Sequence, residues 1–348
     1  MGASMPTEKR FTISDIAKEV GVSTTTVSRY LSGQYRYMSK TTREKIRIAI
    51  QKNGYRPSLV ARGLKASRSY LIGVIMPQVH RTNSSHSIRN ICLACSKTMY
   101  SPIIVSIEDN VDMEERRIQE LLDHRVDGIL TFTGSGDQYY ENVAKEGIPV
   151  VRVDRCGDRR TMDSVVVNHY EVVQEALLNL SVSGYANIAI FSNRFYMSPY
   201  STVGIRRKAY FDFMAKAEGL SPMEYIIDFN DIQSVKSAVH TYLDACVGKP
   251  TAVFVPSMEN LTTLDWVCKL MGLRYPDDIA LLGYALEDDV LSATSRLSVI
   301  SYPLEEMCNT ALSLLMARIA GEPSLPEPPV MKQISASLII RDSTILRL

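Results

Sequence analysis

Apolar residues near the start of the chain recur every three or four positions, which predicts short amphipathic helices. The first helix covers residues 15–20 and ends at Gly21, with Thr12 or Ser14 as its N-cap. The second covers residues 24–31 and follows Gly21 after a tight turn, with Ser23 as its cap. Two short helices joined in this way form a helix-turn-helix.

A third helix is predicted from about Ser39 to Asn53, with Ser39 or Thr41 as its cap. Gly54 and Pro57 end it, because proline cannot continue a helix. All-α structure is therefore expected over residues 11–56.

From residue 71 the pattern changes to short apolar strands that alternate with amphipathic helices. This alternation predicts an α/β body with two doubly wound parallel sheets, one in each of two lobes. The expected strands of the first lobe are 71–76, 102–107, 128–132 and 149–153, with a helix at 113–124 among those between them. The expected strands of the second series are 165–168, 187–191, 252–255, 279–284, 299–302 and 336–340. Its expected helices are 170–183, 204–219, 232–246, 260–271 and 304–320.

The charge of the chain is divided unevenly between these parts. Residues 1–68 contain 14 Lys and Arg against 4 Asp and Glu, a net charge of +10, and the other 280 residues contain 25 against 34, a net charge of −9. A basic helical module on an acidic body is typical of a protein that binds a polyanion such as nucleic acid.

The second helix begins with small hydroxyl residues, which suits a helix that enters the major groove of DNA with its N-terminal end. Short side chains at Thr24 and Thr25 let the backbone approach, and their methyl and hydroxyl groups can contact bases or phosphates. Arg29 can reach a guanine edge or a phosphate, while Thr26 and Ser28 fit phosphate contacts better. With the cap Ser23, these residues are the DNA-binding candidates of the head.

Candidate ligand-binding residues in the body lie directly after strands, where open α/β sheets bind their ligands. They are Gln78, Arg81, Asp154, Arg155 and Arg206. No GxSxG, P-loop or HExxH motif accompanies them, and the five histidines lack metal-ligand spacing, so we expect no catalytic residues, metal or cofactor.

The six cysteines show no disulfide framework, which favours the cytoplasm. Cys92 and Cys95 form a CxxC in an expected helix, where we favour two buried thiols over a metal or redox site. The N-terminus has no signal peptide, no apolar run is long enough for a membrane span, and Met1–Ser4 resemble a tag.

Residues 11–70 resemble the head of the lac repressor (LacI/GalR) family, on the stretch FTISDIAKEVGVSTTTVSRYLSG followed by MSKTTREKIRIAIQKNGYRPSLVARGLKASRSY. The resemblance extends to about residue 342 and implies a periplasmic-binding-protein-like body with a ligand in its cleft. It implies base reading by Thr24, Thr25 and Arg29, a hinge helix over 57–65, and a minor-groove wedge at Leu64. The stretch GQYRYMS is one residue longer than in the lac repressor.

In the body, the resemblance matches Asp154 to a residue that binds effector hydroxyls and Arg206 to one that grips the effector. Two acidic positions common in the family are replaced here, one by Pro256-Ser257 and one by Ala285. Arg81 stands where an apolar or aromatic residue is more usual. Fewer carboxylates and more arginines favour an anionic effector, a sugar acid or sugar phosphate.

These features predict a cytoplasmic, nucleoid-associated repressor that binds double-stranded operator DNA under the control of a small carbohydrate. A homodimer is expected, because one helix-turn-helix reads too few base pairs and residues after Pro328 carry no leucine heptads. The expected organisation is 1–10 as a tag or disordered start, 11–56 as the head, 57–70 as the hinge, 71–342 as the body and 343–348 as a tail.

Two other functions remain as alternatives. A solute-binding protein of a transport system would share the body but requires a signal peptide and no basic head. An enzyme on the same fold would require a catalytic set. The sequence leaves open which effector binds, which operator is read, and whether the effector releases DNA or promotes its binding.

Overall fold

The computed structural model describes residues 11–31, 33–55, 68–108, 110, 112–134, 137–155, 161–193, 201–286, 296–327 and 329–346. The chain divides into two compact units, Met1–Tyr70 and Leu71–Leu348. Leu64 and most of the predicted hinge lie outside the described residues.

The first unit, here called the head, contains the three predicted helices. They are α1 (Ile13–Val20), α2 (Thr24–Leu31) and α3 (Lys40–Lys52), and a 3₁₀ turn, η1 (Tyr35–Tyr37), precedes α3. They enclose a small apolar core of Ile16, Ala17, Val27, Ile46 and Ala49.

The caps of these helices resolve the alternatives that the sequence left open. Thr12 caps α1 in a capping box with Asp15, so the helix begins two residues earlier than predicted. Ser39 caps α3 through Thr42 N–H. Gly21 has φ +76°, the left-handed conformation that lets the chain turn from α1 to α2.

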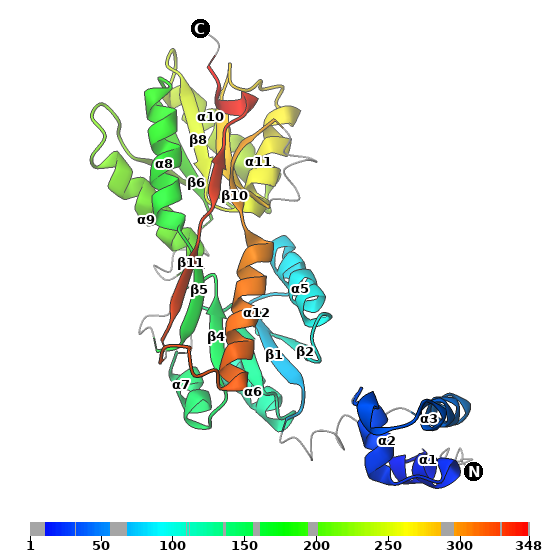
Figure 1. Cartoon of the computed structure of the whole chain (residues 1–348). Helices are drawn as coiled ribbons and strands as arrows, with labels where there is room; N and C mark the ends of the chain where they lie inside the picture. Colours follow the sequence, from blue (N-terminus) through cyan, green and yellow to red (C-terminus); the bar gives the residue numbers. More distant parts are fainter. Residues whose placement is uncertain are drawn as a thin grey trace, which may run out of the picture. The chain divides into compact units, whose positions relative to one another are not determined.

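The second unit, here called the body, has two lobes, each built on a six-stranded sheet (Figure 1). The first sheet has the order β11-β5-β4-β3-β1-β2 and all of its pairs are parallel. Its strands are β1 (Leu71–Met76), β2 (Ser101–Ser106), β3 (Gly128–Thr131), β4 (Val150–Val153), β5 (Asp163–Val167) and β11 (Met331–Ile334). Its helices are α5 (Thr82–Cys95), α6 (Asp112–Asp123), α7 (Asp137–Lys145) and α12 (Leu304–Ala320), of which α5 and α12 lie side by side (Figure 1).

The second sheet has the order β12-β10-β9-β8-β6-β7, and its described pairs are parallel except that β12 runs antiparallel to β10. Its strands are β6 (Asn187–Ser192), β7 (Met223–Ile226), β8 (Thr251–Val255), β9 (Ala280–Leu286), β10 (Ser298–Tyr302) and β12 (Ser337–Ile339). The helices of this lobe are α8 (His169–Val182), α9 (Thr202–Met214), α10 (Ile232–Ala245) and α11 (Met258–Leu270), with a 3₁₀ turn, η4, at Asp342–Thr344. The predicted pair of doubly wound sheets is thus confirmed, apart from the antiparallel edge at β12. Two elements expected in the second series, the strand at 165–168 and the helix at 304–320, belong instead to the first lobe as β5 and α12.

Two edge strands, β7 and β11, escaped the sequence analysis. Apart from the buried Ile334, their residues are half-buried or exposed, so the MEYI and MKQI stretches lack the apolar run that predicts a strand. Residues 343–344 are buried, and the Ser343 hydroxyl donates to Leu281 O (2.6 Å), so this end of the chain packs on the second lobe.

The predicted pair of buried thiols is half wrong. Cys95 is buried on α5, but Cys92 is exposed on the same helix. Residues three apart share a helix face only in part, and here the core covers one of them. Within the described residues, no helix is long and apolar enough to cross a membrane, and no group of side chains could hold a metal ion.

Candidate functional site

The predicted DNA-binding residues of the head lie along α2, from its N-cap side to Arg29 in its last turn. Thr24, Thr25 and Arg29 are exposed, whereas Val27 between them is fully buried in the head core. The Ser23 hydroxyl accepts from Thr26 N–H (3.1 Å) and lies 3.0 Å from the Thr26 hydroxyl. Ser23 and Thr26 therefore fix the start of the helix, while its exposed face presents Thr24, Thr25, Ser28 and Arg29, of which Ser28 is half-buried.

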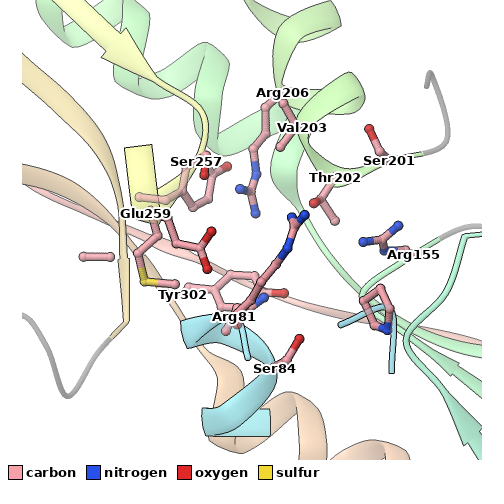
Figure 2. Close-up of a pocket in the computed structure, with 15 residues that line it drawn as sticks. Arg81, Ser84, Arg155, Ser201, Thr202, Val203, Arg206, Ser257, Glu259 and Tyr302 are labelled. Atoms are coloured by element: carbon pink, nitrogen blue, oxygen red, sulfur yellow. The ribbon is translucent and has the colours of Figure 1, made fainter. Parts of the chain in front are cut away.

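The body holds a pocket at the carboxyl ends of its strands (Figure 2). Side chains from both lobes line it, including those of three arginines. The lining residues are Pro77, Arg81, Asn83, Ser84, Arg155, Ser201, Thr202, Val203, Arg206, Ser257, Met258, Glu259, Tyr284, Ala285 and Tyr302.

Three of the five predicted ligand-binding residues thus meet in one place. Arg81 is the N-cap residue of α5, Arg155 follows β4, and Arg206 lies in α9. Gln78 is held as the hydrogen-bond acceptor of Arg81 and does not line the pocket itself. The guanidinium groups of Arg81 and Arg206 point toward the same space in Figure 2.

The positions where the family's acidic residues are replaced also lie at this pocket. Ser257 begins the turn into α11, and Ala285 lies within β9, which extends two residues beyond the predicted end of that strand. Neighbouring Gly283 is required by close packing, since a Cβ there would lie 2.8 Å from Val255 O.

A model of the bacterial regulatory proteins of the lacI family matches residues 12–58, and a periplasmic-binding-protein-like domain model matches residues 179–344. The HTH-type transcriptional regulator KdgR of Bacillus subtilis is 26% identical over 337 residues, which cover 95% of this chain and 97% of that protein. Catabolite control protein A of Priestia megaterium is 28% identical over 310 residues, covering 87% and 91%.

The chain is a transcriptional regulator of the lacI family. The fold of this regulator also matches that of the lac repressor dimer bound to operator and the anti-inducer ONPF. That structure has a TM-score of 0.80 and 21% identity, and the match covers 97% of this chain and 100% of the other.

Beneath the pocket of the lacI-family regulator, Arg206 is held by buried partners. Its Nη1 donates to Pro256 O (2.7 Å), and its guanidinium lies over the Tyr284 ring, 3.5 Å from the ring centre. Its Nε donates to His169 Nδ1 (3.4 Å). A cation with fixed partners on one side presents its remaining edge to a ligand in a set direction.

His169 joins this arginine to Asp154 of the first lobe. Its Nε2 lies 3.1 Å from Asp154 Oδ1, and the tautomer that satisfies both contacts carries its proton on Nε2. Burial and the neighbouring Arg206 cation lower the pKa of His169 to about 4, so the ring is neutral at pH 7.

Asp154 stays ionised although it is buried. Burial opposes the charge, but the hydrogen bond from His169 and the Arg206 cation hold the pKa of Asp154 below its usual value. Its backbone has φ +65°, an uncommon conformation outside glycine. Asp154 faces His169 here and is not among the residues that line the pocket.

Sequence reasoning missed two residues of this region, Glu259 and His169. Glu259, in the first turn of α11, is the one carboxylate among the described lining residues, and its Oε1 accepts from Thr82 N–H of α5 (3.1 Å). It therefore links the second lobe to the first at the pocket. Both residues follow strands closely, so the rule that selected Arg81 and Arg155 could have selected them.

Proposed function

We propose that this regulator is a cytoplasmic repressor whose affinity for operator DNA is controlled by an anionic carbohydrate, a sugar acid or a sugar phosphate. The observation that carries the proposal is the set of three arginines at the pocket, Arg81, Arg155 and Arg206, against one carboxylate among the described lining residues. Arginine pairs with carboxylate or phosphate in a bidentate geometry, which neutral sugars cannot offer.

The carbohydrate class has support from proteins of the same fold. Solved structures of similar fold are titled as complexes of CelR with cellobiose (TM-score 0.64) and of an Enterococcus faecium regulator with ribose (TM-score 0.65). Tyr284 and Tyr302, which line the pocket here, offer aromatic and hydroxyl surfaces that suit a polyhydroxy ligand.

In the head, we assign base reading to Thr24, Thr25 and Arg29 and phosphate contacts to Thr26 and Ser28, with Ser23 as the cap that orders them. The exposure of Thr24, Thr25 and Arg29 on the same helix, α2, supports this assignment. Leu64 remains the predicted minor-groove wedge. A homodimer would place two heads on the two halves of an operator.

The effector and the operator would then be coupled by linkage. If the effector binds one arrangement of the lobes better than another, the operator affinity changes by the same factor as the effector affinity. Arg206, His169 and Asp154 connect the lobes at the pocket, so a ligand on Arg206 would act on that connection directly.

A thermal-shift panel of the full chain tests the effector class, with sugar acids, sugar phosphates and neutral sugars as ligands. A ligand at 100 times its Kd should stabilise the protein by about 2.7 kcal/mol. A rise in Tm with acids or phosphates and none with neutral sugars is expected. Tight binding of a neutral sugar that Arg206→Ala leaves unchanged would overturn the anionic assignment.

DNA binding is tested with duplexes selected from a random library. The affinity for the selected duplex should fall steeply with salt, because each phosphate contact releases counterions. The hit from the thermal panel, added to this complex, should change the operator affinity. A flat salt response, or no selected sequence, would overturn the regulator mechanism.

A further inference from the structure

The turn between α2 and α3 carries two exposed tyrosines that the functional assignment does not use. This aromatic turn, Tyr35–Tyr37, lies in the GQYRYMS stretch that is longer than in the lac repressor. Tyr37 is 53% exposed and Tyr35 38% exposed, so neither ring serves mainly as a core residue. Large exposed rings beside a proposed nucleic-acid surface call for a functional account.

At least one arginine guanidinium group lies over each ring. Arg29 lies over the Tyr37 ring, 5.0 Å from its centre, and Arg36 lies over the same ring at 4.6 Å. Arg43 of α3 lies 3.7 Å from the centre of the Tyr35 ring. The aromatic turn thus gathers cations from α2, from α3 and from itself.

The backbone holds the aromatic turn close to Arg29. Gln34 N–H donates to Arg29 O (2.9 Å), and the Tyr35 ring meets the Tyr30 ring edge to face, with centres 5.7 Å apart. Tyr30 packs against the head core, which anchors the turn to α2. These contacts hold the backbone of the aromatic turn beside the last turn of α2, where Arg29 lies.

We propose that Tyr37 is a positioning residue that orients Arg29 for reading a base pair. This inference rests on the proposed function of the head. An arginine on a flexible stem must lose rotamer freedom to form two parallel hydrogen bonds with a guanine edge. A ring on one face of the guanidinium fixes the plane of the group while its N–H edge stays open to the base.

The proposal predicts an effect on sequence discrimination rather than on overall affinity. A phosphate contact would weaken binding to all duplexes alike, whereas a misdirected Arg29 loses preference at one base pair. From the usual strength of exposed cation–π contacts, the preference at that base pair should fall about two- to fivefold.

The experiment begins with a motif selected by the wild-type full chain from random duplexes. Arg29→Ala then identifies the base pair that depends on Arg29, and Kd values are measured for the four base pairs at that position. Tyr37→Leu should reduce the preference there and nowhere else, while Tyr37→Phe, which keeps the ring, should retain it. Arg43→Ala is the matched control, since it removes the cation over the Tyr35 ring and leaves the Tyr37 ring and Arg29 in place. Circular dichroism verifies that each variant melts like the wild type.

Three outcomes overturn the inference, and a fourth overturns the proposed function. Unchanged preference in Tyr37→Leu would show that Arg29 needs no ring, and an equal loss for all duplexes would make Tyr37 a backbone contact. An equal loss of preference in Tyr37→Phe would assign the effect to the hydroxyl group. A wild-type chain that selects no motif would instead overturn the proposed function on which the inference stands.

Discussion

The head and the body use their charged residues in opposite ways. The ion pairs of the head are exposed, as between Glu44 and Arg47, whose side chains are 55% and 46% exposed. In the body, Asp163 and Arg318 form an ion pair with exposures of 3% and 14%, and Arg152 pairs with Asp137 in full burial. The head thus presents its ion pairs to solvent, whereas the body encloses these two pairs and also has exposed ones, such as that of Arg274 and Asp278.

The difference follows from what each part has to bind. DNA is a long polyanion, so a basic surface attracts it without a fixed partner for every cation. A small ligand is recognised by a few groups in fixed directions, and burial with several hydrogen bonds provides that fixation. Arg206, held by His169, Pro256 and Tyr284, is an example of a buried and fixed cation. Arg29, which lies over the exposed Tyr37 ring, is an example of a cation open to solvent.

The largest expected effect concerns the buried pair of Asp163 and Arg318. Asp163 accepts from Arg318 Nε (2.7 Å), Arg318 Nη2 (3.1 Å) and Val330 N–H (2.8 Å), which ties β5 to α12 and to the segment before β11. Asp163→Asn leaves a buried guanidinium without its counter-charge and should lower the free energy of unfolding by about 3–5 kcal/mol.

Urea unfolding followed by circular dichroism measures this effect. The control is Glu44→Gln in the head, which breaks an exposed pair and should leave the unfolding curve unchanged. Equal effects of the two substitutions would remove the contrast between head and body.

His169 gives a pH-dependent effect of similar size. Its pKa is about 4 when folded and 6.5 ordinarily, so between these values the unfolded chain binds a proton that the folded chain does not. Stability should therefore fall as the pH is lowered from about 6.5 to 4, by at most about 3 kcal/mol. Above pH 6.5 the residue contributes no pH dependence.

Other groups titrate in the same range, so the observable is the difference between wild type and His169→Gln. The variant should lose part of the decline in unfolding free energy between pH 6.5 and 4. His124→Gln, which alters an exposed histidine, should retain the decline. Parallel curves for wild type and His169→Gln would contradict a neutral buried ring.

Arg206→Ala should weaken an anionic effector by about 10- to 100-fold, because hydrogen bonds to charged groups contribute about 1.5–3 kcal/mol. Isothermal titration with the sugar acid or phosphate found in the thermal panel measures the change. Arg207→Ala is the matched control, since Arg207 pairs with Glu224 and does not line the pocket. Comparable losses in both variants would point to a general electrostatic effect instead of a site at Arg206.

The sequence predicted best those features that form within one short stretch of the chain. The head lies within about fifty consecutive residues, and helix α2 matches its predicted bounds of residues 24–31. In the body, apolar runs predicted the buried strands but not the edge strands β7 and β11, most of whose residues are half-buried or exposed.

The pocket shows the same dependence. The rule that ligands bind after strands found Arg81 and Arg155, because that rule needs only the order of strands, while Arg206, within α9, was supported by the family resemblance. It could not show that Glu259 would reach Thr82, 177 positions away, or that His169 would lie between Asp154 and Arg206. Those contacts arise from the way two lobes pack, which no single stretch encodes.

The smallest expected change in affinity concerns Glu259, whose substitution distinguishes an anionic effector from a neutral one. Its carboxylate should repel an anionic effector by on the order of 1 kcal/mol. Glu259→Gln should then raise the affinity for an acid or phosphate about fivefold and leave a neutral sugar unaffected. Glutamine keeps the size of the side chain and an oxygen acceptor for Thr82 N–H, so the contact between the lobes is preserved. A loss of affinity in this variant would mean that Glu259 accepts hydrogen bonds from effector hydroxyl groups. The pocket would then combine arginines for the acid with a carboxylate for the sugar, and the contrast with the predominantly basic head would become sharper.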